Sequence, residues 1–290
     1  MGEGTGYVTS QPILRFAPSP NGFLHLGHAY SALFTWRAAA ELAGVALLRI
    51  EDTDITRCKP EFTDAIMADL AWLGLSWPEP VLQQSTRFPV YAEAAARLAA
   101  QDLVYPCFCS RSEIAAAAHG HDPDGAPLYP GTCRHLSSQE VTERLERGDA
   151  VQYRLKSDRA IQLAGILNFR VAQPDVTSPI QVRRAHPERW GDVVIQRKGT
   201  PTSYHLSVVV DDAFQHVSNV TRGRDMEAAT DFHVLLQTLL GLPSPVYTFH
   251  DLILDEDGRK LAKSRESESL RALRAAGWSA DDVRRHLGFA

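Results

Sequence analysis

The chain has 290 residues, of which 44% are hydrophobic and 22% charged, a composition typical of a globular protein with one or two domains. No apolar run reaches the length that crosses a bilayer, and residues 1–11 lack the features of a signal peptide, so we expect a cytoplasmic protein without a membrane anchor. The net charge of −5 excludes a generally basic nucleic-acid-binding body, so any such contact needs a local basic patch.

The first predicted unit is a strand, a loop rich in Pro and Gly, and a helix. Residues 13–17 are apolar and strand-like, and helical spacing of apolar residues covers 27–42. His25 and His28 bracket Gly27 where the helix begins. A helix N-terminus presents free N–H groups and the positive end of a dipole, and imidazoles add donors, so this pattern indicates a phosphate site. The alternative is a turn with incidental histidines.

Acidic residues follow the second predicted strand. Residues 45–50 form an apolar run interrupted only by Arg49, as in a buried parallel strand, and complete a strand–helix–strand unit. Glu51 and Asp52 come directly after it. Because such units bind ligands at the carboxyl ends of their strands, these carboxylates are candidate ligand contacts. The alternative is a capping role.

The remaining elements are predicted from periodicity and capping signals. Helices are expected at residues 61–73, 89–101 and 227–240, with a further one from a capping box at 137–140 to near 148 and two short ones within 268–287. Strands are expected at residues 151–156, 168–172, 192–196 and 217–221, whereas 204–214 fits either type and 74–85 reads as a loop.

Three of the four cysteines, Cys107, Cys109 and Cys133, lie in one loop-rich window with few core residues. In a chain without an export signal, clustered cysteines indicate a metal before a disulfide, and zinc would need a fourth ligand. The nearby candidates for that ligand are Tyr129, His119, His121 and His135. Chemistry alone favours a histidine over a phenol with a pKa near 10. The alternative is a set of buried, unligated cysteines.

Two basic segments lie in the second half of the chain. Arg222 and Arg224 fall between a predicted strand and a helix, where an arginine can clamp a carboxylate; the alternative is an exposed surface position. Residues 260–264, Lys-Leu-Ala-Lys-Ser, follow an Asp-Gly turn. A lysine there can place a point charge on a phosphate, although an isolated basic pentapeptide is usually a solvated loop.

Together, these segments resemble the signatures of class I aminoacyl-tRNA synthetases in their glutamyl form. The matching segments, in order, are residues 15–22 with 25–28, 49–54, 208–212 with 221–225, and 260–264. The last is similar to the lysine loop of the class, with Ala262 where serine is usual. The matches are ordered and span residues 15–264.

The length of the chain indicates which group of glutamyl enzymes it resembles most. A full glutamyl-tRNA synthetase carries a helical anticodon-binding body after the lysine loop, whereas this sequence ends about 25 residues after it. That architecture resembles the glutamyl-queuosine tRNA(Asp) synthetase family, truncated paralogues that attach glutamate to queuosine in the anticodon loop of tRNA(Asp). We therefore expect ATP-dependent glutamate activation followed by this transfer.

The resemblance implies an α/β fold with a Rossmann-like class I catalytic domain, an inserted zinc-containing mixed α/β subdomain and a short C-terminal helical segment. The expected divisions are residues 1–103 and 191–250 for the two catalytic halves, 104–190 for the insertion, and 251–290 for the lysine loop and C-terminal helices. No anticodon-binding domain is expected, and the resemblance implies a monomer.

The resemblance also implies roles for individual residues. Glutamate would be bound by Arg15, Phe16, Ala17, Pro18, Ser19, Glu51, Tyr204 and Arg222. ATP, accompanied by Mg²⁺, would be bound by His25, Gly27, His28, Lys260 and Lys263, of which His25, His28 and Lys263 would be catalytic. One structural Zn²⁺ would be held by Cys107, Cys109, Tyr129 and Cys133, which overrules the preference for histidine. The partners are then glutamate, ATP and tRNA(Asp) carrying queuosine.

Three other functions are open to the same residues. A shortened enzyme could charge tRNA(Glu), and an inactive paralogue could sense glutamate or ATP. Retention of both histidines and Lys263 argues against the inactive form. A nucleotidyltransferase with a different substrate could share the histidine loop, but it would not need Glu51 and Arg222 in these places.

Overall fold

The computed structural model describes residues 11–253 and 269–289. Its strands, in chain order, are β1 (Ile13–Phe16), β2 (Val45–Ile50), β3 (Leu82–Gln83), β4 (Val104–Cys107), β5 (Gln152–Leu155), β6 (Asn168–Ala172), β7 (Ile180–Arg184), β8 (Val194–Gln196), β9 (Asn219–Gly223) and β10 (Val246–His250). Its α-helices are α1 (Leu26–Glu41), α2 (Pro60–Trp72), α3 (Phe88–Ala100), α4 (Arg111–Ala117), α5 (Ser138–Glu146), α6 (Ser157–Ala164), α7 (Tyr204–Phe214), α8 (Ala229–Leu240), α9 (Leu270–Ala275) and α10 (Ala280–His286). Short 3-10 turns are η1 (Gln84–Arg87), η2 (Pro187–Trp190) and η3 (Arg224–Met226).

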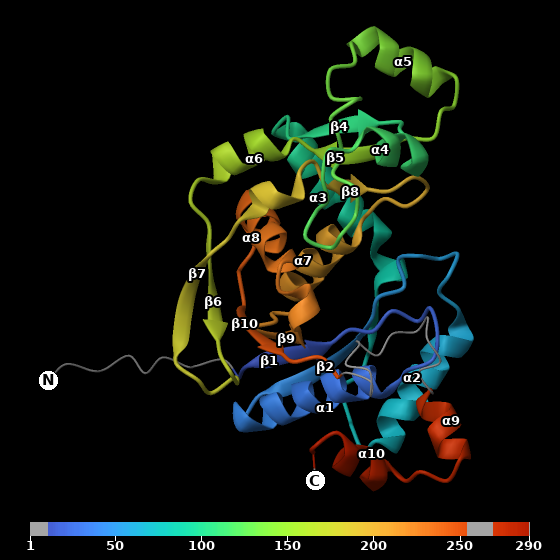
Figure 1. Cartoon of the computed structure of the whole chain (residues 1–290), viewed down its shortest axis with the longest axis vertical. Coiled ribbons are helices and arrows are strands. Elements are labelled where there is room, and N and C mark those ends of the chain that lie inside the picture. Colours follow the sequence, from blue (N-terminus) through green and yellow to red (C-terminus); the bar gives the residue numbers. More distant parts are fainter. Residues whose placement is uncertain (1–10, 254–268, 290) are drawn as a thin grey trace, which may run out of the picture.

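Two parallel sheets meet edge to edge in the body of the molecule (Figure 1). One has the order β1-β2-β3, and the other has the order β7-β6-β10-β9, in which only β7 is antiparallel to its neighbour. The two sheets join where the backbone N–H of Ser218 donates to the carbonyl of Ile13 at 2.9 Å. Chain connections run in opposite directions from this junction, so it is the topological switch point where α/β folds bind ligands.

Apolar side chains from both halves of the chain pack against these sheets. On one side, α3, α7 and α8 share a core with the second sheet, and α8 is buried around nearly its whole surface. On the other, α1 and α2 share a core with α9 and α10. The predicted stop of α8 is confirmed, since Gly241 takes the left-handed conformation, with φ of 65°, that ends many helices.

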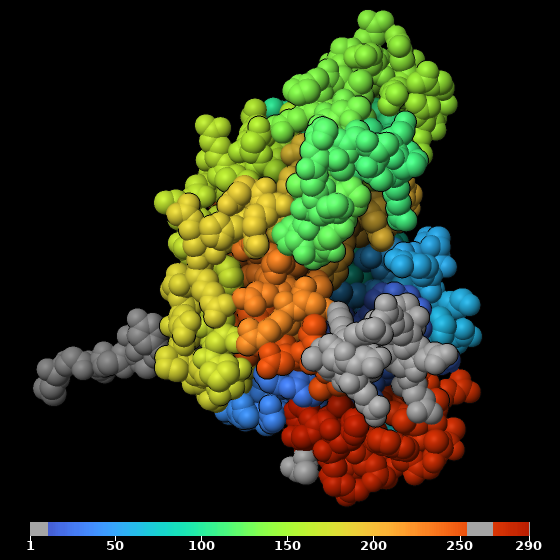
Figure 2. All heavy atoms as spheres, in the orientation of Figure 1, coloured from blue at the N-terminus to red at the C-terminus, as the bar shows by residue number. Residues whose placement is uncertain are grey.

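A third, antiparallel sheet of order β4-β5-β8 lies at one end of the molecule, where it carries α4 and α5 (Figure 1). Figure 2 shows that this end projects from the α/β body. The predicted capping box of α5 is confirmed, because the Ser137 hydroxyl accepts from the N–H of Glu140, whose carboxylate accepts from the N–H of Ser137. A small core of Tyr105, Phe108 and two cysteines supports this end.

Several elements differ from the sequence prediction. The prediction missed β10, whose five residues are all buried, as well as β7, α4 and α6. The expected loop at 74–85 contains β3, and β9 begins two residues later than expected. The ambiguous segment 204–214 is the helix α7. Residues 168–184, expected within the insertion, hydrogen-bond as β6 and β7 to the second sheet, while the division of the chain into domains stays a prediction.

Across the two described stretches, no helix is both long enough and apolar enough to cross a membrane.

Candidate active site

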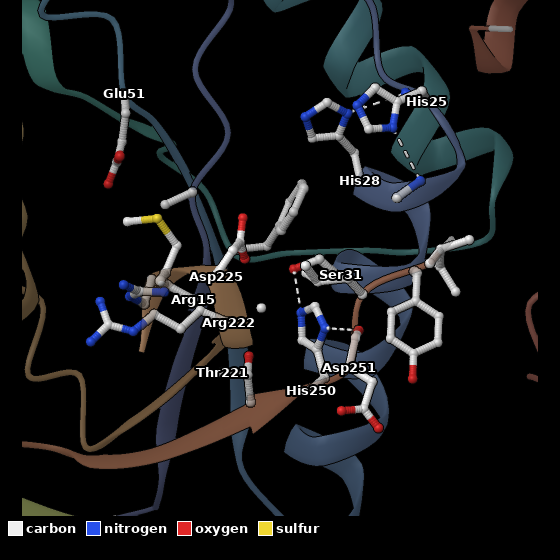
Figure 3. Close-up of a pocket in the computed structure, with 18 of the residues that line it drawn as sticks. Arg15, His25, His28, Ser31, Glu51, Thr221, Arg222, Asp225, His250 and Asp251 are labelled. Atoms are coloured by element: carbon white, nitrogen blue, oxygen red, sulfur yellow. Dashed lines mark hydrogen bonds between the residues drawn. The ribbon is translucent and has the colours of Figure 1, made fainter. Parts of the chain in front are cut away.

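A cavity of about 490 Å³ opens at the switch point, between the carboxyl ends of β1, β2 and β9 and the N-terminus of α1 (Figure 3). It brings together most of the residues predicted to contact glutamate or ATP. Those that line it are Arg15, Phe16, Ala17, His25, Gly27, His28, Glu51, Tyr204 and Arg222. These residues come from β1, α1, α7 and β9 and from the loops that follow β1 and β2, so their convergence is a property of the fold and not of one motif.

The other predicted substrate residues are Pro18, Ser19, Lys260 and Lys263. Pro18 and Ser19 do not line this cavity; the carbonyl of Pro18 instead accepts from the backbone N–H of Glu51 at 3.0 Å. Pro18 therefore places the Glu51 backbone beside β1. Lys260 and Lys263 lie outside the described residues.

His25 and His28 cap the first turn of α1. The N–H of Gly27 donates to Nδ1 of His25 at 3.1 Å, and the N–H of His25 donates to Nδ1 of His28 at 3.2 Å. An imidazole nitrogen that accepts a hydrogen bond carries no proton, so in each neutral ring the proton is on Nε2. The caps thus set a tautomer in which each Nε2 can donate to an anion at the helix N-terminus.

A buried ion-pair network orients Glu51. Arg49, at the end of β2, donates to Glu51 at 3.0 Å and to Asp212 at 2.7 Å, while Arg15 also donates to Asp212 at 3.0 Å. Burial raises the pKa of Glu51, and the two arginines act against this rise. Burial also opposes ionisation of Asp212, but Arg15 and Arg49 hold the pKa of that carboxyl below its usual value. Each charge in the network has a partner, as buried charges require.

Arg222 has different surroundings. It lies within β9, although the sequence placed it in the following loop. One Nη atom lies 3.2 Å from Nδ1 of His233, the other donates to the hydroxyl of Thr230, and the buried Nε has no hydrogen-bond partner. No carboxylate of the described residues forms an ion pair with Arg222. Figure 3 shows Arg222 beside Arg15, on the side of the cavity away from His25 and His28.

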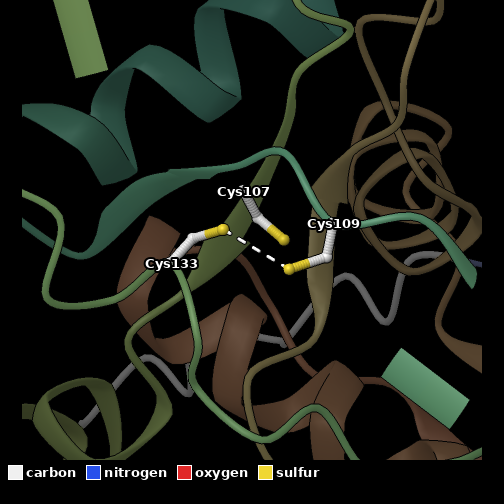
Figure 4. Close-up of side chains that lie close together, drawn as sticks. All are labelled: Cys107, Cys109 and Cys133. Atoms are coloured by element: carbon white, nitrogen blue, oxygen red, sulfur yellow. Dashed lines mark hydrogen bonds between the residues drawn. The ribbon is translucent and has the colours of Figure 1, made fainter. Parts of the chain in front are cut away.

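The three clustered cysteines lie close together next to the antiparallel sheet, at the end of β4 (Figure 4). The sulfur atoms of Cys107, Cys109 and Cys133 all lie within 4.8 Å of one another. Tyr129 is beside them, with its hydroxyl 3.8 Å from Sγ of Cys109 and accepting from the N–H of Cys133 at 2.7 Å. Within the described residues, no histidine belongs to this cluster. Although burial opposes it, hydrogen bonds from Tyr129 and two further side chains lower the pKa of Cys107 to about 7.

Comparison with known proteins adds to this geometry. A model of the family "tRNA synthetases class I (E and Q), catalytic domain" matches residues 13–286. The chain belongs to this family.

Individual relatives of this class I synthetase differ in length. This chain is 45% identical to the glutamyl-Q tRNA(Asp) synthetase of Rhodobacter capsulatus, over 95% of its own length and 99% of the relative. It is 38% identical to the glutamate–tRNA ligase of Geobacter sulfurreducens, over 91% of this chain but 54% of the relative. Among solved structures, a glutamate tRNA ligase from Elizabethkingia meningosepticum, in complex with its amino acid, superposes with a TM-score of 0.69 at 26% identity. That match covers 93% of this chain and 54% of the ligase.

Two acidic residues of the synthetase act as anchors. Asp52, in the loop after β2, accepts from the backbone N–H and the hydroxyl of Ser85, at 2.7 and 2.6 Å. Asp211, which is fully buried, accepts from Arg87 at 2.8 Å and from Tyr91 at 2.6 Å. These contacts tie η1 to the loop after β2, which carries Glu51, and tie η1 and α3 to α7, which carries Asp212.

Sequence reasoning assigned no role to several residues of the synthetase site. Arg49 and Asp212 lie in the quoted motifs, and an arginine inside the apolar run 45–50 was a usable sign of a buried ion pair. His233 and His250 had no such signal. His250 lines the cavity, with Nε2 at 3.1 Å from the hydroxyl of Ser31.

Proposed function

We propose that this synthetase activates glutamate with ATP to form glutamyl-adenylate, and then transfers the glutamyl group to queuosine in the anticodon loop of tRNA(Asp). The observation that carries the acceptor assignment is the match to the R. capsulatus glutamyl-Q tRNA(Asp) synthetase, which spans 99% of that relative. The glutamate–tRNA ligase relative is matched over about half its length, so charging of tRNA(Glu) is the less favoured alternative. As part of this proposal, we place the reaction in the cytoplasm.

The charges around the cavity support glutamate as the amino acid. Glutamate carries two carboxylates and one ammonium group, and each needs a partner when it leaves water. Arg15 and Arg222 would bind carboxylate, Glu51 would bind the ammonium group, and the hydroxyl of Tyr204 would add a further contact. The cavity walls formed by Phe16 and Ala17 would enclose the aliphatic part of the substrate.

The N-terminus of α1 supports ATP as the second substrate. The positive end of its dipole and the Nε2 atoms of His25 and His28 can attract phosphate oxygens. In the first step, a carboxylate oxygen of glutamate attacks the α-phosphorus, and pyrophosphate leaves with the electrons of the broken P–O bond. The family resemblance assigns Lys260 and Lys263 to the phosphates, with Mg²⁺ accompanying ATP. In the second step, a nucleophile of queuosine attacks the acyl carbon and AMP leaves. Catalysis in both steps is then positioning and electrostatic stabilisation.

We also propose that the cysteine cluster holds one structural Zn²⁺. Thiolates are preferred zinc ligands, and a tetrahedral structural site has four ligands, so three thiolates need one further donor. Cys107, Cys109 and Cys133 would supply the thiolates, and Tyr129 is the polar side chain placed to complete the set. The metal would tie β4 to the loop that carries Cys133, in a region with few apolar residues of its own.

A glutamylation assay tests the proposed acceptor. Purified enzyme, ATP and labelled glutamate are incubated with tRNA(Asp) containing queuosine, with tRNA(Asp) lacking it, and with tRNA(Glu). We expect label in the first tRNA alone. Equal labelling of both forms of tRNA(Asp) would contradict the acceptor assignment, and labelling of tRNA(Glu) would favour the alternative. Failure of glutamate-dependent ATP–pyrophosphate exchange without tRNA would contradict the activation step.

A further inference from the structure

Two histidines to which the proposed mechanism gives no role lie behind Arg222. His205 is in the first turn of α7, and His233 is in the middle of α8. Nδ1 of His205 lies 3.1 Å from Nε2 of His233, and Nδ1 of His233 lies 3.2 Å from an Nη atom of Arg222. The three side chains therefore form one continuous hydrogen-bonded row that ends at the cavity.

The direction of the hydrogen bonds in this row follows from Arg222. A guanidinium can only donate, so Nδ1 of His233 must accept and carries no proton. Nε2 of His233 then bears the proton and donates to Nδ1 of His205. Both rings are neutral in this arrangement. In agreement with this, burial lowers the pKa of His205 to about 4 and the pKa of His233 well below its ordinary value, and the charge of Arg222 adds to both shifts.

The row holds Arg222 without neutralising it. His233 and the hydroxyl of Thr230 both orient the guanidinium, and neither is an anion. Arg15, by contrast, shares the carboxylate of Asp212 with Arg49. Because a buried cation whose hydrogen-bond partners are all neutral is costly, Arg222 favours a bound anion much more strongly than Arg15 does.

We propose that His233, supported by His205, is a positioning residue that presents Arg222 as an uncompensated cation to the side-chain carboxylate of the substrate. The proposal rests on glutamate activation as the function. The cavity supports this choice of carboxylate, because Arg222 lies away from His25 and His28, where the reacting carboxylate must meet ATP (Figure 3). Glutamine, whose amide is neutral, would leave Arg222 without a counter-charge. The row therefore makes His233 a determinant of specificity for glutamate over glutamine.

Three substitutions of His233 separate this role from a structural one. His233→Asn keeps an acceptor at the place of Nδ1, His233→Leu removes it, and His233→Asp replaces it with an anion. Val234→Ala is the matched control, because Val234 is a buried neighbour on α8 that points about 100° away around the helix. The measurement is ATP–pyrophosphate exchange without tRNA, with glutamate and glutamine as alternative substrates, together with the melting temperature of each variant.

We expect His233→Leu to raise KM for glutamate roughly tenfold, the effect of one lost hydrogen bond to a charged group, with KM for ATP unchanged. His233→Asn should restore KM to within about threefold of wild type. His233→Asp should raise KM for glutamate at least about a hundredfold and lower the preference for glutamate over glutamine at least about tenfold, because the new carboxylate neutralises Arg222.

Two results would overturn the positioning role. One is an unchanged KM for glutamate in His233→Leu. The other is that KM for glutamate and KM for ATP rise by the same factor in both His233→Asn and His233→Leu. If His233→Leu does not fold, the comparison of His233→Asn with His233→Asp tests the proposal instead. An unaltered preference for glutamate over glutamine in His233→Asp would contradict it. If wild-type enzyme catalyses glutamate-dependent exchange and the His233 variants have the same KM for glutamate as wild type, this inference alone is contradicted. Absence of exchange in wild type contradicts the proposed function, and the inference with it.

Discussion

Arg49 donates a hydrogen bond of 3.0 Å from Nη2 to Oε1 of Glu51, two residues further along the chain, and its own side chain has no exposed surface. The same guanidinium holds Asp212, which in turn holds Arg15. These four charges balance, and Arg222 adds one positive charge beside them. Glutamate has one more carboxylate than ammonium groups, so the net charge of these five side chains complements that of the proposed substrate.

Glu51 is expected to control glutamate binding through its ionised form. Replacing Glu51 with Gln should raise KM for glutamate by about thirtyfold or more, because the ammonium group loses its counter-charge. Burial raises the pKa of Glu51, so protonation on acidification begins at a higher pH than in an exposed glutamic acid. KM of wild type should therefore begin to rise on acidification at a higher pH than the titration of an exposed glutamic acid would cause, whereas KM of Glu51→Gln should not follow it. If KM for glutamate depends on pH in the same way in wild type and in Glu51→Gln, this role of Glu51 is contradicted.

Asp212 is expected to be important for both stability and binding. Asp212→Asn would leave Arg15 and Arg49 without their shared buried carboxylate, and should lower the free energy of unfolding by about 3 kcal/mol and raise KM for glutamate. Urea unfolding and exchange kinetics measure the two effects. Asp102→Asn is the matched control, because Asp102 also faces two cations but is exposed, and it should leave the urea midpoint essentially unchanged. Equal midpoints for the two variants would refute the prediction.

The two nitrogens of His28 are expected to have separable roles. His28→Asn keeps an acceptor for the N–H of His25 and so preserves the helix cap, but it lacks the Nε2 donor. His28→Ala lacks both. If Nε2 stabilises the phosphate in the transition state, both variants should lose roughly a hundredfold in exchange rate. Only His28→Ala should lose helix stability. Activity near wild type in His28→Asn would show that His28 acts through the cap alone.

Metal content tests the cysteine cluster. Cys107→Ser and Cys133→Ser should reduce bound zinc, measured by atomic emission after purification, from about one ion per chain to near zero. Cys58→Ser is the control, because Cys58 lies outside the cluster, and it should retain the metal. Tyr129→Phe should weaken zinc binding in a chelator competition. Zinc content that is the same in all four variants would rule out the site.

Asp69 offers a test of stability against pH. This carboxyl, on α2, is 4% exposed, and its Oδ2 has no hydrogen-bond partner. Burial raises its pKa to about 6, with Arg274 and Arg271 acting in the opposite direction. The folded state therefore binds the proton more tightly than the unfolded chain, so Asp69 stabilises the fold less as pH rises from about 4 through about 6.

Asp69→Asn removes that dependence. It should raise the free energy of unfolding by up to about 3 kcal/mol at pH near 8, and the gain should shrink to nothing below pH of about 4. Urea unfolding at several pH values measures this difference. Asp64→Asn, an exposed change on the same helix, should show no such trend. A gain that does not depend on pH would contradict the assigned cause.

Local patterns were sufficient for elements whose signal lies within their own residues. The apolar run of β2 and the capping box of α5 occur where they were expected, because burial on both faces and end-capping are visible in a few consecutive letters. By contrast, β10 has no period of its own and follows a short loop after α8. Its strand conformation depends on pairing with β6 and β9, which are distant in sequence.

The candidate site divides in the same way. By itself, the sequence predicted the chemistry of the candidate site, since Arg15, Glu51, Arg222 and the two histidines stand out in ordered motifs near the ends of expected strands and helices. Only the tertiary structure decided which charges are paired. Arg15 meets the carboxylate of Asp212 on α7, whereas Arg222 meets the neutral ring of His233 on α8. The pairing depends on which faces of α7 and α8 pack against the strand ends, and helix packing is set by side chains far apart in the sequence.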